Sequence, residues 1–138
     1  MRPVLDYVER LAGVDPRLSF LTLRSSFIYA CETGDLVRVT SGLRTKKEQA
    51  DLVARGKSQT YHSYHLRGLA VDLAIIRDGV AIWDHWAFHN LNMIFQEVAH
   101  EHGLVVTWGG SWAKLVDAVH WQLETFDPRY GVQFPQDT

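Results

Sequence analysis

The sequence has a single cysteine, Cys31, among its 138 residues. One cysteine cannot form a disulfide within the chain, and it excludes a zinc site built from several thiolates. Cys31 lies in the largely apolar stretch SSFIYACETG, so we expect it to be buried as a small hydrophobic residue and not to act as a reactive thiol.

Long hydrophobic runs and a basic excess are also missing. No segment approaches the roughly 18 apolar residues that a membrane helix requires, and Asp6 and Glu9 interrupt the N-terminal stretch where a secretory signal would be apolar. We therefore expect synthesis in the cytoplasm, no signal peptide and no membrane partner. The formal net charge of -2 gives no sign of nucleic-acid binding. We also expect a monomer.

The composition is that of an ordinary globular protein, with 46% hydrophobic and 22% charged residues. A chain of this length can bury one substantial core. Neither an internal repeat nor a linker divides it, so we expect one domain over residues 1–138.

Hydrophobic periodicity and cap residues divide the chain into helices and strands. Asp15 followed by Pro16 indicates a helix start, and Thr45 with Glu48 three residues later is typical of a capping box. The order contains few strand-helix-strand crossovers, which favours an α+β fold with helices packed on a small antiparallel sheet. The expected helices span residues 3–13, 15–34, 45–56 and 89–103, and the expected strands span 36–42, 69–76, 104–110 and 118–124.

A carboxylate interrupts the otherwise apolar strand LAVDLAII. Strand alternation places Asp72 on one face with Ala70 and Ala74, and the bulkier residues on the other face. An unpaired buried carboxylate is costly, so Asp72 requires a partner.

Two histidines are candidates for a shared metal site with Asp72. His65 precedes the strand by a short turn at Gly68, and His120 occupies the less bulky face of strand 118–124. Two histidines and one carboxylate form a common catalytic zinc set, with one position left for water. Spacing alone leaves the alternative that His65 caps a turn and that Asp72 pairs with an arginine such as Arg67.

Two sequence motifs resemble those of a known family. SYHLRGLAVDL is similar to the Ser-x-His-x-x-Gly-x-Ala-x-Asp signature of zinc peptidases that cut bacterial cell-wall stem peptides, the D-alanyl-D-alanine carboxypeptidase and L-alanyl-D-glutamate peptidase family. DAVHWQL resembles the second motif of that family, in which an acid precedes the last zinc histidine by three residues. The matching residues are Ser63, His65, Gly68, Ala70 and Asp72 in the first motif, and Asp117, His120 and Trp121 in the second.

Two further segments extend the resemblance to roughly Val39 to Leu123. SGLRTKKEQADLVARG is similar to the upstream block of the family, with Arg44, Gln49 and Gly56 at its recurring positions. WGGSW resembles the Trp-Gly-Gly-Asp-Trp stretch of the L-alanyl-D-glutamate subgroup, which includes phage endolysins. Ser111 stands where that subgroup usually has aspartate.

The resemblance implies roles for the residues that carry it. His65, Asp72 and His120 would bind Zn²⁺. Asp117 would act as general base, or would only orient a metal ligand. Arg44 would bind the free α-carboxylate of D-glutamate or the developing oxyanion, unless it is a surface arginine at a strand end.

Four residues are candidates for substrate binding, each with a structural alternative. Ser63 either forms hydrogen bonds near the site or holds the turn, and Gln49 lies on a helix face where it could be structural. Trp108 and Trp112 flank two glycines and either line a groove or pack around a tight turn. The other histidines lack metal-site spacing, and we do not expect them to be ligands; they are His62, His85, His89, His100 and His102.

The implied function is that of a zinc-dependent peptidoglycan endopeptidase that cleaves the L-alanyl-D-glutamate bond of stem peptides. Its partner would be the bacterial stem peptide, and a phage endolysin would reach the cell wall after release by a separate pore-forming protein. The alternatives are a D-Ala-D-Ala carboxypeptidase or dipeptidase of the same fold, and a non-catalytic virion component that binds the wall.

Overall fold

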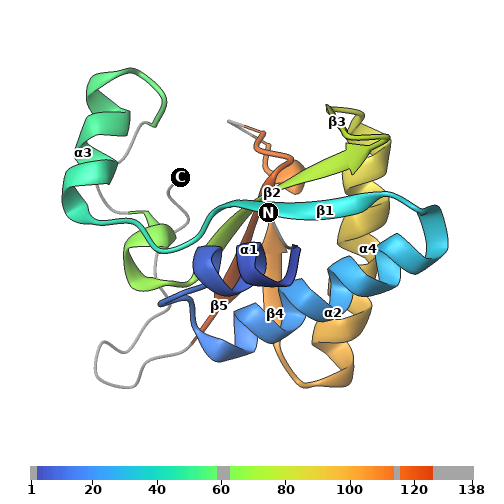
Figure 1. Cartoon of the computed structure of the whole chain (residues 1–138). Coiled ribbons are helices and arrows are strands. Elements are labelled where there is room, and N and C mark those ends of the chain that lie inside the picture. Colours follow the sequence, from blue (N-terminus) through green and yellow to red (C-terminus); the bar gives the residue numbers. More distant parts are fainter. Residues whose placement is uncertain (1–2, 59–62, 114–115, 126–138) are drawn as a thin grey trace.

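The computed structural model describes residues 3–58, 63–113 and 116–125, with side chains described from residue 7 onward. Figure 1 shows the order of the elements. The chain forms α1 (Pro3–Arg10), α2 (Pro16–Thr33), β1 (Leu36–Ser41), α3 (Lys46–Ala54), η1 (Tyr64–Arg67), β2 (Ala70–Arg77), β3 (Val80–Ile82), α4 (His85–Glu101), β4 (Val105–Trp108), η2 (Gly109–Ser111) and β5 (His120–Glu124), where η denotes a short 3₁₀ helix.

The sheet is antiparallel throughout, and β2 is its central strand. β1 pairs with one edge of β2. On the other edge, β5 pairs with the first part of β2 and β3 pairs with its last part. β4 pairs with the outer edge of β5. The α+β fold with a small antiparallel sheet, predicted from the sequence, is thus confirmed.

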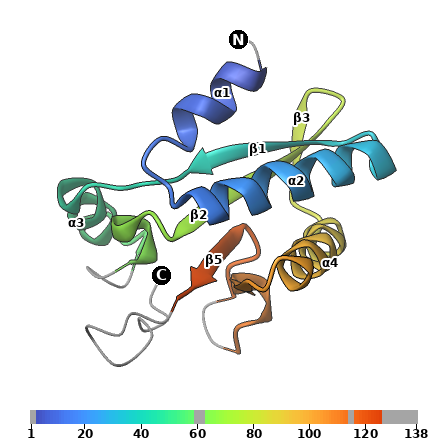
Figure 2. The same cartoon turned by 90° about the horizontal axis from the view of Figure 1, so that it is seen from below.

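The hydrophobic core lies between this sheet and two helices. α2 and α4 pack against each other, α2 also contacts β1, and α4 also contacts β4. From β2, the bulky side chains of Val71, Leu73 and Ile75 join the core. Figures 1 and 2 place α3 and α4 at opposite ends of the molecule, with β2 and β5 between them.

Local sequence signals explain where two helices begin. The Asp15 side chain accepts a hydrogen bond from the backbone N–H of Arg17, and Pro16 occupies the first turn of α2. Thr45 and Glu48 form both hydrogen bonds of a capping box at the start of α3. Both predicted starts are confirmed.

Several elements differ from the expectation. Gly109 and Gly110, expected in a strand, begin the 3₁₀ helix η2 instead, and η1 was not predicted. α4 begins at His85, four residues earlier than predicted, because Asp84 caps it and Phe88 extends its buried face. β3 was not predicted from the sequence. Asp78 and Gly79 both have positive φ, so they form the two-residue turn that joins β2 to β3.

The prediction for Cys31 was wrong, because its side chain is exposed. The buried face of α2 contains Leu18, Leu21, Ser25 and Tyr29, which recur at helical spacing. Cys31 lies outside this periodicity and therefore faces away from the core.

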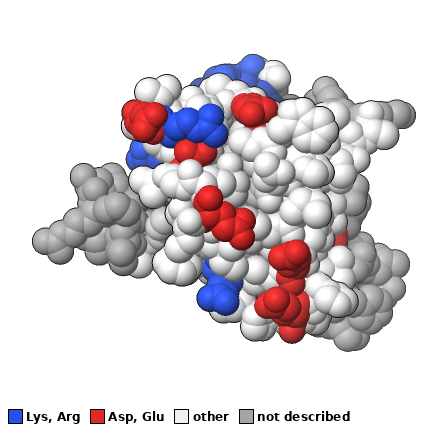
Figure 3. All heavy atoms as spheres, turned by 90° about the vertical axis from the view of Figure 1, so that its right-hand side faces the viewer, with Lys and Arg blue, Asp and Glu red and all other residues white. Residues whose placement is uncertain are grey.

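The surface at the α4 end is mostly uncharged, with acidic and basic side chains scattered over it (Figure 3). Several large apolar side chains are exposed on β3, α4 and the turn between them: Val80, Trp83, Trp86 and Met93. Among the described residues, no helix combines the length and the hydropathy needed to cross a membrane.

Candidate metal centre

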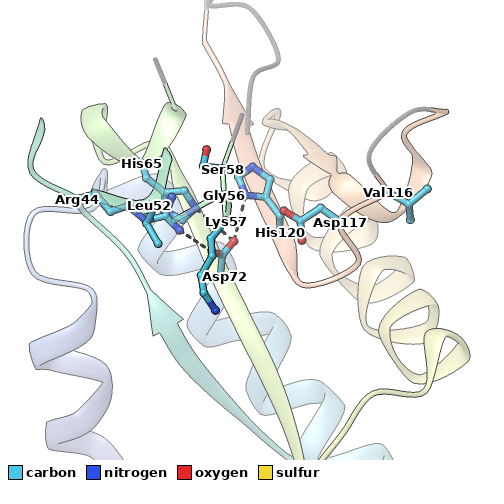
Figure 4. Close-up of a pocket in the computed structure, with 10 residues that line it drawn as sticks. All are labelled: Arg44, Leu52, Gly56, Lys57, Ser58, His65, Asp72, Val116, Asp117 and His120. Atoms are coloured by element: carbon cyan, nitrogen blue, oxygen red, sulfur yellow. Dashed lines mark hydrogen bonds and ion pairs between the residues drawn. The ribbon is translucent and has the colours of Figure 1, made fainter. Parts of the chain in front are cut away.

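Three side chains from different elements meet at one end of the sheet. His65 comes from η1, Asp72 from β2 and His120 from the start of β5, where it pairs directly with Asp72 across the two strands. Asp72 Oδ1 lies 3.3 Å from His65 Nε2 and 3.1 Å from His120 Nδ1. Figure 4 shows both imidazoles directed toward this carboxylate.

These distances fit a small divalent cation. Metal bonds of 2.0–2.2 Å in a tetrahedral zinc site separate neighbouring ligand atoms by about 3.3 Å. One ligand atom from each of His65, Asp72 and His120 lies within 4.8 Å of the other two. A search of the described residues for clusters of at least three His, Cys, Asp or Glu side chains that could hold a metal ion finds this group.

In the neutral form that binds a metal, the hydrogen bonds of the two histidines direct the correct nitrogens inward. His65 Nδ1–H donates to the Gly42 carbonyl oxygen over 2.8 Å, which leaves the Nε2 lone pair facing Asp72. His120 Nε2–H donates to Gln122 Oε1 over 2.9 Å, which leaves its Nδ1 lone pair facing the same place. Both rings are 1% exposed, so these contacts hold each of them in place.

Arg44 pairs with Asp72. Its Nη2 donates to Asp72 Oδ2 over 2.9 Å, its Nε donates to Ser41 Oγ and its Nη1 donates to Gln49 Oε1, each over 3.1 Å. The arginine on Asp72 is therefore Arg44, and not the Arg67 considered as the alternative. These contacts use three of the five guanidinium N–H donors, which leaves two for a ligand among the described residues.

An irregularity in β1 brings Arg44 to this position. The register between β1 and β2 shifts between Val39 and Ser41, so Thr40 is an extra residue and Ser41 comes to lie opposite Asp72. A bulge of this kind bends the strand and redirects the chain that follows. It carries the carbonyl of Gly42 to His65 and the guanidinium of Arg44 to Asp72.

The electrostatics match a site that is made for a cation. Burial acts to raise the pKa of Asp72, but the charges and hydrogen bonds of His65 and His120 outweigh it and hold that pKa far below its usual value. Burial acts to lower the pKa of His120, but the hydrogen bond to Asp72 and its charge raise it instead. Asp72 is therefore a carboxylate in this environment.

Asp117 lies in the turn immediately before β5, as predicted from the sequence. Its backbone N–H donates to the Gly109 carbonyl over 3.0 Å, and its carbonyl accepts from the N–H of His120 over 3.2 Å. Burial and the negative charge of Asp72 raise the pKa of its carboxyl group. Figure 4 shows Asp117 beside His120.

A cavity of ≈ 400 Å³ opens onto the three candidate ligands. It lies between the end of α3, the candidate ligands and the turn before β5. Arg44 and Asp117 line it together with two residues that sequence reasoning missed, Lys57 and Ser58. The full lining is Arg44, Leu52, Gly56, Lys57, Ser58, His65, Asp72, Val116, Asp117 and His120.

Ser63 and Gln49 lie behind the cavity wall and have structural contacts. Ser63 Oγ accepts from the backbone N–H of His65, which caps η1, and is 2% exposed. Gln49 is also buried, and it connects Arg44 to Ser58, to which its Nε2 donates over 2.9 Å. Their proposed substrate contacts stay predictions.

The two tryptophans of WGGSW occupy different environments. Trp108 is buried against Trp121 and donates from Nε1 to the Ala118 carbonyl over 2.7 Å. Trp112 is half-buried, with its ring centroid 5.2 Å from that of His120. Its buried Nε1 has no hydrogen-bond partner within the described part of the chain. Neither tryptophan lines the cavity, so their role in substrate binding stays a prediction.

The remaining histidines lie apart from this group, as far as the structure describes them. His85 and His89 pack near Trp108, and His102 contacts Phe20. His100 is exposed on the last turn of α4. His62 lies outside the described residues.

Comparisons with known proteins point in one direction. Residues 6–129 match the model of a family described as phage L-alanyl-D-glutamate peptidase. An L-alanyl-D-glutamate peptidase of Listeria phage A118 is 35% identical over 86 residues, which cover 62% of this chain and 30% of the relative. The peptidoglycan L-alanyl-D-glutamate endopeptidase CwlK of Bacillus subtilis is 34% identical over 109 residues, which cover 68% of this chain and 64% of the relative.

A solved structure extends the similarity to nearly the whole chain. The L-Ala D-Glu endopeptidase ChiX of Serratia marcescens is 34% identical, with a TM-score of 0.74, and the match covers 92% of this chain and 91% of that one. The two curated relatives are longer, and this chain spans less than two thirds of the length of each.

Proposed function

The chain belongs to the phage L-alanyl-D-glutamate peptidase family, and from that premise we propose that it is a zinc-dependent endopeptidase that cleaves the L-alanyl-D-glutamate bond of peptidoglycan stem peptides. The observation that carries the proposal is the convergence of His65, Asp72 and His120 on one point beside a cavity. The similarity to ChiX over most of the chain supports the same reaction.

Zinc is the metal that this donor set favours, because two imidazoles and one carboxylate leave one tetrahedral position open. When bound, it would polarise the scissile carbonyl and lower the pKa of its water from about 15.7 to about 7. The protein residues keep both imidazoles in the correct tautomer and keep Asp72 ionised.

Asp117 is the proposed general base. It lines the same cavity as the candidate ligands. Its raised pKa lies closer to neutral pH than the pKa of an ordinary aspartate, which suits a group that accepts and then returns a proton. It would accept a proton from the attacking water and return it to the nitrogen of D-glutamate as the amide C–N bond breaks and the C–O bond forms. One product carries L-alanine with a free carboxylate, and the other is a peptide with a free D-glutamate amine.

The cavity also offers positive charge for the substrate. In the stem peptide, the α-carboxylate of D-glutamate lies beside the scissile bond. The two remaining N–H donors of Arg44 can bind a carboxylate or the developing oxyanion. Lys57, on the same wall, supplies a second positive charge.

The proposed biological role is that of a phage endolysin that degrades the host cell wall. The matching family is described as a phage family, and the Listeria phage A118 relative shares 35% identity. In this role the protein would act on peptidoglycan after release by a separate pore-forming protein.

The test is digestion of purified peptidoglycan followed by mass spectrometry of the released peptides. New peptides with a free D-glutamate amine are expected, and release of D-alanine would instead identify a carboxypeptidase. A chelator should abolish the release, and zinc should restore it. The variant Asp117→Ala should lose about 10²–10⁴-fold in rate. The control His100→Ala changes an exposed side chain on the last turn of α4, and its rate should match that of the wild type.

A non-catalytic wall-binding protein is the outcome to be excluded. Such a protein would bind zinc and sediment with cell walls, yet release no peptide from any wall preparation. That result would overturn the proposed reaction while leaving the metal centre intact.

A further inference from the structure

We propose that Glu124 is a positioning residue for the metal centre, which acts through Gln122 to keep the His120 ring with Nδ1 directed at the metal. This inference rests on the proposed function, because it takes His120 to be a metal ligand. It adds two residues, Gln122 and Glu124, that do not line the cavity.

His120, Gln122 and Glu124 are every second residue of β5, so their side chains lie on the same face of the strand. His120 Nε2 lies 2.9 Å from Gln122 Oε1, and Gln122 Nε2 lies 2.8 Å from Glu124 Oε1. His120 is 1% exposed and Gln122 is 0% exposed, so water does not compete for the contact between them, whereas Glu124 is partly buried. A continuous hydrogen-bonded chain therefore runs from the candidate metal ligand to a carboxylate at the end of the strand.

The carboxylate determines the direction of every hydrogen bond in this chain. A carboxylate only accepts hydrogen bonds, so Gln122 must present its NH₂ group to Glu124. The amide oxygen of Gln122 must then face His120, and it also only accepts. Asp72 Oδ1, 3.1 Å from Nδ1, also only accepts, so Asp72 and Gln122 compete for the single proton of the neutral ring. The amide oxygen at Nε2 favours the Nε2–H form, which leaves the lone pair on Nδ1 for a metal.

A second contact connects Glu124 to the other histidine ligand. Tyr64, which immediately precedes His65 in η1, donates from its hydroxyl group to Glu124 Oε2 over 2.8 Å. The two carboxylate oxygens thus serve different partners, Oε1 for Gln122 and Oε2 for Tyr64. Glu124 therefore connects the two elements that carry the histidine ligands, η1 and β5.

Glutamine at position 124 would remove the constraint without changing the size of the side chain. Its amide can donate or accept toward Gln122, so the Gln122 amide can reverse and hold the His120 proton on Nδ1 instead. A fraction of molecules would then lack the second histidine ligand. Loss of a partner that orients a metal ligand typically costs 10–100-fold in metal affinity.

The experiment compares Glu124→Gln with the wild type and with the control Glu97→Gln, which removes the same charge from the exposed face of α4. Nitrogen NMR of metal-free, ¹⁵N-labelled protein, at a pH where the ring is neutral, reports which His120 nitrogen carries the proton. Competition with a chromophoric chelator gives the zinc dissociation constant. We expect a larger fraction of the Nδ1–H form than in the wild type, and roughly 10–100-fold weaker zinc binding, for Glu124→Gln only.

Exchanging the side chains at positions 122 and 124 distinguishes a positioning role of Glu124 from a purely structural one. In the double variant Gln122→Glu/Glu124→Gln, the residue at 122 can again only accept from His120. We expect this exchange to restore the wild-type tautomer and most of the zinc affinity. A purely structural need for the native pair predicts that the double variant is worse than either single variant.

The proposal is overturned if Glu124→Gln keeps the wild-type His120 tautomer and zinc affinity, or if the exchanged pair fails to restore them. The tautomer is measured without metal or substrate. Failure of the wild type to release peptides from peptidoglycan would therefore count against the proposed reaction alone.

Discussion

Arg44 and Asp72 share a partly buried ion pair in which each carboxylate oxygen has a separate function. Arg44 Nη2 donates to Asp72 Oδ2 over 2.9 Å, whereas Oδ1 faces both histidines. Both side chains are largely shielded, at 15% and 16% exposure. The guanidinium therefore fixes the carboxylate plane and leaves one oxygen for a metal.

Arg44→Lys should weaken both metal binding and substrate binding. A lysine ammonium cannot contact Ser41, Gln49 and Asp72 at once as the planar guanidinium does. We expect zinc affinity to fall by about tenfold. If Arg44 also binds the α-carboxylate of D-glutamate, KM should rise more for a stem peptide with a free α-carboxylate than for its α-amide.

Steady-state kinetics on the two synthetic peptides measure this difference, with Arg24→Lys, on the exposed face of α2, as the matched control. Equal changes in KM for both peptides would show that Arg44 orients Asp72 and does not contact that carboxylate.

Asp117→Asn should stabilise the metal-free protein at neutral pH. Burial and the charge of Asp72 raise the pKa of Asp117, so the folded state holds this proton more tightly than the unfolded state does. The contribution of the protonated Asp117 to the stability of the folded state is complete below the unfolded pKa of about 3.9. This contribution is lost as pH rises through the folded pKa. The neutral asparagine avoids that loss.

Thermal unfolding of both proteins in a chelator, across the range from acid to neutral pH, tests this sign. The variant should unfold at a higher temperature than the wild type near neutral pH. The difference between the two unfolding temperatures should become smaller toward acid pH. A variant less stable than the wild type at neutral pH would contradict the expectation.

Asp15→Ala should destabilise α2 by about 1 kcal/mol at neutral pH, the usual effect of removing an N-cap. Asp15 caps the helix and also forms an ion pair with the side chain of Arg17, whose hydrogen bond lowers the pKa of Asp15. A lowered folded pKa stabilises the protein above the unfolded pKa, and this contribution is lost as pH falls through the folded value.

Urea unfolding of wild type, Asp15→Ala and Asp15→Asn measures the effect. Asparagine still accepts the capping hydrogen bond, so we expect it to lose less than alanine does at neutral pH. The advantage of aspartate over asparagine should disappear in acid. An advantage that persists unchanged there would exclude the charge as its cause.

Gly109→Ala should impair zinc binding and peptide release together. A Cβ atom at this position would meet the backbone carbonyl of Asp117 and the Cβ of His120, so η2 and the following turn would have to separate. Overpacking of this kind costs about 1–3 kcal/mol. The nearby exposed Ser111→Ala is the control, and we expect it to bind zinc like the wild type.

Zinc titration and peptide release, compared at equal concentrations of folded protein, check this expectation. Undisturbed zinc affinity in Gly109→Ala would mean that the turn before β5 can shift without moving the imidazole of His120.

The sequence was informative wherever the signal was local. Asp15 and Thr45 are caps whose partners lie within three residues, and both helix starts were correctly predicted. The ordered motifs around His65 and His120 are sufficient to indicate the family. The Asp78-Gly79 turn also carried a local signal for a hairpin, which sequence analysis overlooked.

Contacts between distant segments could not be predicted in this way. The bulge at Thr40 and the pairing of Arg44 with Asp72 depend on the alignment of β1 with β2, which no short motif reports. His120 was placed on the less bulky face of its strand, but the function of its partner Gln122 follows only from Glu124 beyond it. The exposure of Cys31 depended on which face of α2 meets α4.

Asp72 and His120 are direct partners across two neighbouring strands, so the alignment of β5 with β2 determines whether the two side chains meet at the candidate metal centre. Slippage of β5 by one residue would place Val119 or Trp121 opposite Asp72 and send the imidazole to the far side of the sheet. The amount of zinc bound after denaturation and refolding would therefore report the fraction of molecules in which β5 has paired with β2 in the native alignment. The centre could then serve as a built-in reporter of correct refolding.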